Sequence, residues 1–140
     1  MKKDFSYGLV PIYKDEEKIE FLLTQHIEGH WAFPKGHAKG DETSLEAAQR
    51  EFEEEAGIAQ YRVDEGTTFE EEYYPQKDGQ ILHKTVVYYP AFVSDKKVVA
   101  SKEEVADFGW FEYQEAMNKI TFSGSKKILR QVRKYLQKNR

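Results

Sequence analysis

The segment 33–58, FPKGHAKGDETSLEAAQREFEEEAGI, constrains the fold more than any other part of the chain. Thr43 and Glu46 form a T-x-x-E capping box, a pattern that satisfies backbone N–H groups at the start of a helix. No Gly or Pro interrupts residues 44–56, and Gly57 stands where a left-handed C-terminal cap is favoured. The sequence therefore predicts a helix over 44–56.

This helix carries four glutamates within five positions, and helical phasing separates them into two groups. At about 100° per residue, Glu51, Glu54 and Glu55 fall within about 100° of each other, whereas Glu53 points the opposite way into solvent. Arg50, one turn before Glu54, can pair with it. Like charges that converge beside a core repel one another, which costs free energy. A bound divalent cation would make the same arrangement favourable. The stripe that we expect to be buried next to these acids comprises Leu45, Ala48, Phe52 and Ala56.

Composition indicates a soluble globular protein and excludes several chemistries. The 140 residues, 39% of them hydrophobic, suit a single domain over 1–140 with a net charge of -4. The absence of cysteine excludes disulfides, thiolate zinc sites and cysteine nucleophiles, and no H-E-x-x-H, P-loop or G-x-S-x-G motif occurs. No apolar run has the length of a membrane span, and no secretion signal is visible. We expect a cytoplasmic monomer with no membrane partner and no stable nucleic-acid complex.

The first part of the chain predicts two strands and a loop. Residues 5–13 and 19–26 are rich in aromatic and β-branched side chains and are separated by the polar KDEEK, which indicates a β-hairpin. Residues 30–42 are punctuated by Pro, Gly and Gly, which favours a loop.

The second part predicts another hairpin and a final helix. Residues 67–74 and 81–93 flank an Asp78-Gly79 pair, which is a strong turn signal. Two short strands are expected over 98–100 and 108–111, and apolar residues at helical spacing predict a helix over 125–138. This order of elements predicts a mixed α/β (α+β) sandwich, with a sheet between helices.

The spacing of glycine and charged residues in the segment 33–58 matches a known sequence box. Reading from Gly36, the chain shows Gly, five residues, Glu42, seven residues and then REFEEEAGI over 50–58. Seven fixed positions match by chance with a probability of about 10⁻⁸ per starting point. The sequence resembles the Nudix hydrolases, which implies the Nudix fold and hydrolysis of a nucleoside diphosphate linked to a further group. The resemblance also implies Mg²⁺ or Mn²⁺, which neutralises a diphosphate and activates water.

The resemblance implies a role for each charged residue of the box. Glu51, Glu54 and Glu55 would hold the metals, with a backbone carbonyl of Lys35 or Gly36 as a further ligand. Glu51 or a later acid would serve as the base. Arg50 and Glu42 would orient these acids.

Residues outside the box narrow the resemblance to the asymmetrically cleaving diadenosine tetraphosphate hydrolases. The stretches HWAFPKGH, KTVVYY and EEVADFGWF carry this similarity, which extends over nearly all of the chain. It implies that Lys35, His37 and Lys84 contact the polyphosphate, and that Glu104 is a metal ligand or the base. The expected products are ATP and AMP.

Three aromatic residues are candidates for stacking on adenine: Tyr74, Tyr88 and Phe122. Tyr88 and Tyr89 should face opposite sides of a strand, so at most one can reach a shared ligand. Other substrates stay open, namely RNA 5′ ends, mononucleotides and diphosphoinositol phosphates. A nucleotide-binding module without turnover is a further alternative, although such proteins tend to lose box acids and this chain has them all.

Overall fold

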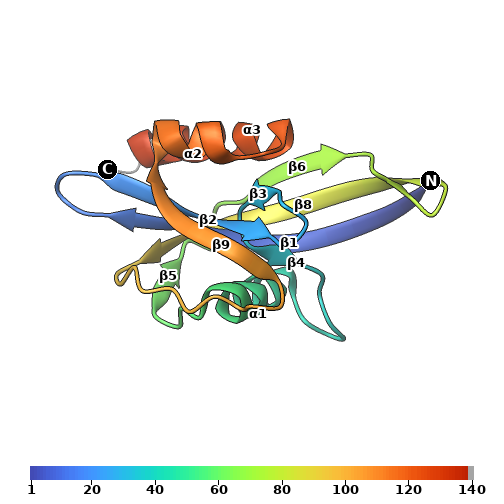
Figure 1. Cartoon of the computed structure of the whole chain (residues 1–140), viewed down its shortest axis with the longest axis horizontal. Helices are drawn as coiled ribbons and strands as arrows, with labels where there is room; N and C mark the ends of the chain where they lie inside the picture. Colours follow the sequence, from blue (N-terminus) through green and yellow to red (C-terminus); the bar gives the residue numbers. More distant parts are fainter. Residues whose placement is uncertain (139–140) are drawn as a thin grey trace.

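The computed structural model describes residues 1–138 and divides them into nine strands and three helices. The helices are α1 (Ser44–Ala56), α2 (Tyr113–Lys119) and α3 (Ser123–Lys138). The strands are β1 (Lys2–Lys14), β2 (Ile19–His26), β3 (Trp31–Ala32), β4 (Lys35–Gly36), β5 (Tyr61–Val63), β6 (Phe69–Tyr73), β7 (Gln76–Lys77), β8 (Gln80–Val93) and β9 (Val105–Glu112). Figure 1 shows the sheet between α1 on one face and α2 with α3 on the other, which confirms the predicted mixed α/β sandwich.

A parallel pair of long strands forms the centre of the sheet. β1 and β8 pair over Lys2–Ile12 and Leu82–Phe92, and the strand order is β3-β2-β1-β8-β5. Both predicted hairpins are confirmed, since β1 pairs with β2 beside their turn, and β6 and β7 pair with β8. At the tip of the second hairpin, Asp78 and Gly79 have φ angles of 51° and 76°, which only a few residue types adopt easily.

The central strands bury side chains on both faces, because helices cover both faces. Val10 and Leu23 pack in the cluster on the side of α3, whereas Leu9 and Leu22 pack with Phe52 of α1. Alternation along each strand thus divides one hydrophobic sequence between two cores.

Helix α1 begins and ends as its sequence predicts. Thr43 and Glu46 close both hydrogen bonds of the capping box, and Gly57 ends the helix with a φ of 66°. The buried face comprises Ala47, Ala48, Phe52 and Ala56, so the predicted stripe is confirmed except that Leu45 is half-buried and Ala47 takes its place. The helix is thereby fixed with one flank against β1 and β4.

Two predicted segments differ from the structure. The expected strand over 98–100 is wrong: the N–H of Val99 donates to the carbonyl of Ala56, and the N–H of Ser101 donates to that of Glu55. The two N–H groups satisfy the last carbonyl groups of α1, so they do not pair with a neighbouring strand. The next strand, β9, is longer than the expected 108–111 and pairs with β2.

The segment 30–42 is a loop except for four residues in the two-residue strands β3 and β4. β4 pairs with β1 and holds the glycine of the box against the sheet. Within residues 1–138, no helix combines the length and the apolar character that crossing a membrane requires.

Candidate active site

Three carboxylates converge where α1 meets the segment before β9. Glu51 and Glu55 project from α1, Glu104 comes from the turn that precedes Val105, and each offers an oxygen within 4.8 Å of the others. The Oε2 atom of Glu55 is buried and has no hydrogen-bond partner among the described residues. An unsatisfied buried carboxylate oxygen is costly unless a cation or a proton compensates it. We call these three residues the acid ledge.

The protonation of the ledge reflects its crowding. Burial, followed by the charges of Glu51 and Glu104, raises the pKa of Glu55 to about 8, although Lys35 opposes the shift. Burial also raises the pKa of Glu51, and Glu54 and Glu104 add to this effect against Arg50. Two partly desolvated acids beside a third are the arrangement that a hard divalent cation favours, since it supplies the positive charge that these oxygens lack. The ledge therefore fits a magnesium-type ion.

Gly36 lets the loop approach the ledge closely. A Cβ atom at this position would overlap the carboxyl group of Glu51. Any other residue would force either β4 or the carboxylate to move. Glycine is thus needed here because there is no room for a side chain, and not because the backbone adopts an angle that only glycine favours.

Arg50 organises the acids around the ledge. Its guanidinium donates to both oxygens of Glu42, to Glu51 at 3.0 Å, to Glu54 at 3.2 Å and to the carbonyl of His37 at 2.8 Å. Hydrogen bonds to Glu42 above all raise the pKa of Arg50, so this residue stays charged. The predicted orienting pair of Arg50 and Glu42 is therefore present as a contact.

The structure separates Glu53 and Glu54 from the ledge. Glu54 is exposed and faces Arg50, as its i, i+4 spacing predicts, and its oxygens are not grouped with those of Glu51, Glu55 and Glu104. Glu53 is exposed on the opposite side and accepts a hydrogen bond from the hydroxyl of Tyr61 at 2.7 Å.

A cavity of about 600 Å³ adjoins the ledge. A small hollow of about 50 Å³ beside Glu55 and Glu104 shares His30, Ala32 and Lys35 with this cavity. The larger space is of the size that binds small molecules. We call the two neighbouring spaces, which share these three lining residues, the groove. The lining residues of the larger space include Glu71, Tyr73, Phe122 and Ser125.

Lys35 lies at the junction of the two spaces. Burial lowers its pKa, with a contribution from Lys84, while the nearby charges of Glu71, Glu55 and Glu51 act in the opposite direction. A desolvated cation next to several acids is well placed to meet the negative charge of a phosphate. The structure thus brings Lys35 to the groove, where the resemblance expects a phosphate contact.

The other two expected phosphate contacts form a cluster with an aspartate. The ammonium group of Lys84 lies 2.7 Å from Oδ2 of Asp4, 2.6 Å from Oγ of Ser6 and 3.3 Å from Nε2 of His37. Nε2 of His37 also lies 3.1 Å from Oδ1 of Asp4. Lys84 is therefore not a free surface cation, although it shares a cluster with His37 as expected.

The three candidate aromatic residues occupy different environments. Phe122 lines the cavity, is 56% exposed and has its ring 5.5 Å from that of His30. Tyr74 is exposed and stacks on His83 outside the cavity lining. Tyr88 has no exposed surface, packs against Phe33 and donates to Glu71, so its placement in the core does not fit a stacking role.

The cavity residues that the sequence did not identify as candidates include His30, Glu71 and Tyr73. Tyr73 is the last residue of β6, directly before the expected Tyr74, and alternation places it on the same face of the strand as the buried Phe69 and Glu71. His30 belongs to the HWAFPKGH stretch, and its imidazole stacks on His26 with ring centres 4.8 Å apart. Nothing in the sequence distinguishes Glu71 from the neighbouring acids of FEEEY except the same alternation.

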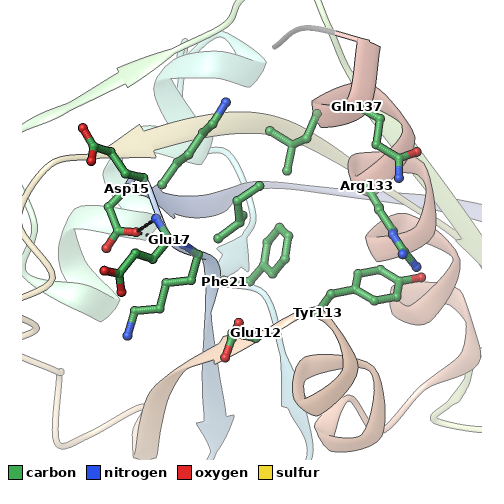
Figure 2. Close-up of a pocket in the computed structure, with 12 residues that line it drawn as sticks. Asp15, Glu17, Phe21, Glu112, Tyr113, Arg133 and Gln137 are labelled. Atoms are coloured by element: carbon green, nitrogen blue, oxygen red, sulfur yellow. Dashed lines mark hydrogen bonds between the residues drawn. The ribbon is translucent and has the colours of Figure 1, made fainter.

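A further hollow of about 520 Å³ shares no lining residue with this groove. Figure 2 shows it beside the turn between β1 and β2, with Phe21 in its wall and Tyr113 and Arg133 from α2 and α3. It contains no group of acids like the ledge within the described residues.

Comparison with known proteins gives a consistent result. The family model described as NUDIX domain matches residues 3–132. The asymmetrical bis(5′-nucleosyl)-tetraphosphatases of Sus scrofa and Rattus norvegicus are 36% and 37% identical over 127 residues, which is 87% of this chain and 84% of each relative. The solved structure of a C. elegans Ap4A hydrolase binary complex superimposes with a TM-score of 0.83 at 30% identity, covering 95% of this chain and 97% of that one. The chain therefore belongs to the NUDIX domain family and is a Nudix hydrolase.

Proposed function

We propose that this protein hydrolyses diadenosine tetraphosphate to ATP and AMP. The observation that supports this most directly is the groove, in which the hollow beside Glu55 and Glu104 shares Lys35 and His30 with a cavity of small-molecule size. A base in the cavity would direct its phosphates past Lys35 toward the acids. The names of the relatives agree with this substrate class.

Nudix hydrolases generally use divalent metal ions, and the ledge fits such an ion. Glu51, Glu55 and Glu104 would hold it, with a carbonyl of Lys35 or Gly36, and Glu54 would join them if it leaves Arg50. Bound there, Mg²⁺ or Mn²⁺ supplies a Lewis acid that lowers the pKa of water and neutralises phosphate charge.

The protein's own residues would position the substrate and move the proton. Phe122 would stack on one base at the mouth of the cavity. Lys35, His37 and Lys84 would compensate the charge of the phosphate chain. Glu104 or Glu51 would accept the proton of the attacking water, and the exposure of Glu104 lets it pass that proton to solvent.

A product analysis tests the reaction. The purified protein with Mg²⁺ is incubated in ¹⁸O-labelled water with diadenosine tetraphosphate, nucleoside diphosphate derivatives, mononucleotides, diphosphoinositol phosphates and triphosphorylated RNA. We expect ATP and AMP from the first substrate, with label in one of the two, and no turnover in excess chelator. Two ADP molecules as the main product would contradict asymmetric cleavage, and preferential turnover of RNA 5′ ends would contradict diadenosine tetraphosphate as the substrate.

The monomeric state and the cytoplasmic location stay predictions, which light scattering and cell fractionation test.

A further inference from the structure

Asp4 occupies the position of an anion between two cation-type side chains. Its Oδ2 atom lies 2.7 Å from the ammonium of Lys84, and its two oxygens lie 3.1 and 3.2 Å from Nε2 of His37. Lys84 and His37 are the two residues, besides Lys35, that the proposed function assigns to the phosphate chain. The carboxylate thus makes the contacts that a phosphate oxygen would make.

The ammonium group of Lys84 is enclosed in this arrangement. It donates to Asp4 and to Ser6, and Nε2 of His37, which donates to Asp4, lies 3.3 Å from it. The Lys84 side chain is only 8% exposed, whereas that of Asp4 is 32% exposed. A phosphate can therefore reach this cation only by replacing a partner, and Asp4 is the one anion among the three.

The backbone around Asp4 allows such a replacement. Asp4 stands directly opposite Lys84 in the parallel pairing of β1 with β8. In the described part of the chain, β2 pairs with β1 at residues 12–14 and β4 pairs with it at residues 7–8, so residues 2–6 have a strand on one side only. An edge of this kind yields more easily than a central strand.

Asp4 is ionised when the site is empty of substrate. Burial opposes the charge, but the hydrogen bonds and charges of Lys84 and His37 outweigh it and hold the pKa of Asp4 below its usual value. A fixed negative charge at this point repels an incoming phosphate and competes for the same donors.

We propose that Asp4 is a built-in competitor of the phosphate chain, which a substrate must displace from Lys84 and His37. This inference rests on the proposed function for the identity of the phosphate ligands. Asp4 would then weaken the binding only of chains long enough to reach Lys84. It is a specificity-determining residue, since short diphosphates that stop at Lys35 would not encounter it.

The alternative role for Asp4 predicts the opposite sign. If Asp4 only positions Lys84, then removing its charge loosens the ammonium group and weakens phosphate binding. If Asp4 competes, then Asp4→Asn strengthens binding, because asparagine keeps the shape and a hydrogen-bond acceptor while it loses the charge. The direction of change therefore separates the two roles.

Calorimetric titration of the full chain with inorganic tripolyphosphate in excess chelator tests the inference without turnover. We expect Asp4→Asn to lower the Kd by about three- to tenfold, with a smaller gain at high salt. Glu16→Gln, which removes one negative charge from the β1–β2 turn, is the matched control and should leave the Kd unchanged. Unchanged or weaker binding by Asp4→Asn would overturn the proposal. Asp4→Ser must shift the Kd in the same direction, which keeps the test valid if either variant is unstable.

Steady-state kinetics provide the second arm. Asp4→Asn should lower the KM for diadenosine tetraphosphate and leave that for a nucleoside diphosphate derivative unchanged, and the gain should vanish in a Lys84→Ala background. Equal gains on both substrates would overturn the length dependence. If the wild-type protein turned over no dinucleoside polyphosphate, the proposed function would fail, while the tripolyphosphate titration would still decide the role of Asp4.

Discussion

The two ends of the groove are built in different ways. The acid end derives mainly from one run of sequence, the box over 36–58, with Glu104 added from another segment. The cavity at the other end collects side chains from the turn before β3, from β4, from β6 and the residues after it, and from the start of α3. The acid end brings three carboxylates within 4.8 Å of one another around a small hollow, whereas the cavity is larger and has Phe122 at its surface.

From this difference we infer that the acid end determines the chemistry and that the cavity determines which substrate binds. The carboxylates must hold their oxygens within a few ångströms of each other, and one rigid helix achieves this with residues four apart. A base needs only a ring face and some space, which many combinations of loops can provide. Changes at the acid end should therefore affect turnover, and changes at the cavity should affect binding.

The largest effect should follow from Glu55→Gln. This change keeps the size of the side chain but removes the charge at the buried oxygen that has no other partner. We expect kcat to fall by at least about a hundredfold, because the ion would lose its most buried ligand. Steady-state kinetics with diadenosine tetraphosphate and Mg²⁺ measure it, with circular dichroism to verify folding. A kcat equal to that of the wild type would show that Glu55 is not part of the site.

Glu54→Gln, measured in parallel, should also lower kcat strongly if Glu54 leaves Arg50 to bind the ion. A mild effect would mean that only the three acids of the ledge are ligands.

The next largest effect should come from the opposite end of the groove. Phe122→Ala should weaken substrate binding by roughly 1 to 3 kcal/mol, about 5- to 150-fold, for adenine and guanine substrates alike, because stacking uses the π-face that every base has. Titration with a non-hydrolysable dinucleotide measures the Kd. Tyr74→Ala is the matched control, because Tyr74 is an exposed aromatic residue outside the cavity lining. Normal binding together with a lower Tm would show that Phe122 contributes to core packing and not to ligand binding.

An effect of intermediate size concerns pH. The pKa of Glu55 is about 8 in the folded, metal-free protein, against about 4.3 for an unfolded glutamate. The folded state therefore binds the extra proton, and its free energy of unfolding falls as the pH rises from about 4.3 through 8. In chelator, the Tm of the wild-type protein should decline relative to Glu55→Gln over this range, and Mg²⁺ should restore it at pH 8. A difference in Tm that does not vary with pH would contradict the assigned pKa.

The smallest effect should follow from Glu53→Gln. This residue is exposed on the far side of α1 and accepts a hydrogen bond from Tyr61, so its loss should change kcat by less than about twofold and cost little stability. The same kinetic assay measures it. A loss of kcat as large as that of Glu55→Gln would mean that Glu53 does not lie on the side of α1 that faces away from the site.

The acid end could largely be predicted from the sequence, because helical geometry is local. The capping box, Gly57 and the phasing of the glutamates all follow from residues within one turn of each other, and the structure agrees with them. Glu104 was expected as a metal ligand or the base and lies beside Glu51 and Glu55, whereas Glu54, which was expected in the same group, is not in it. The i, i+4 spacing predicted the contact of Arg50 with Glu54, but not that this contact leaves Glu54 outside the group of acids.

The cavity was harder to predict, because its composition depends on long-range register. The same holds for Asp4 and Lys84, which lie outside the cavity lining: the pairing of β1 with β8 brings them opposite each other, and a parallel pairing between segments eighty residues apart leaves no local signal. Alternation indicated correctly that Tyr88 and Tyr89 face opposite ways, but not which face is covered by α3. Tyr88 therefore looked like a ligand-binding residue, although it belongs to the core.

The hydrogen bonds from Val99 and Ser101 to the last carbonyls of α1 have a consequence for how this chain can tolerate insertions and deletions. They fix the start of the turn that carries Glu104 to the helix that carries Glu55. Residues 94–95 precede both this attachment and Lys96, whose carbonyl accepts from the indole of Trp110, so a change of length there should displace Glu104 least. Residues 102–103 follow the attachment, and one residue more or less there would shift Glu104 by about 3.5 Å, beyond the reach of a shared ion. The connection before β9 should therefore tolerate a change of length at its start but not next to Glu104.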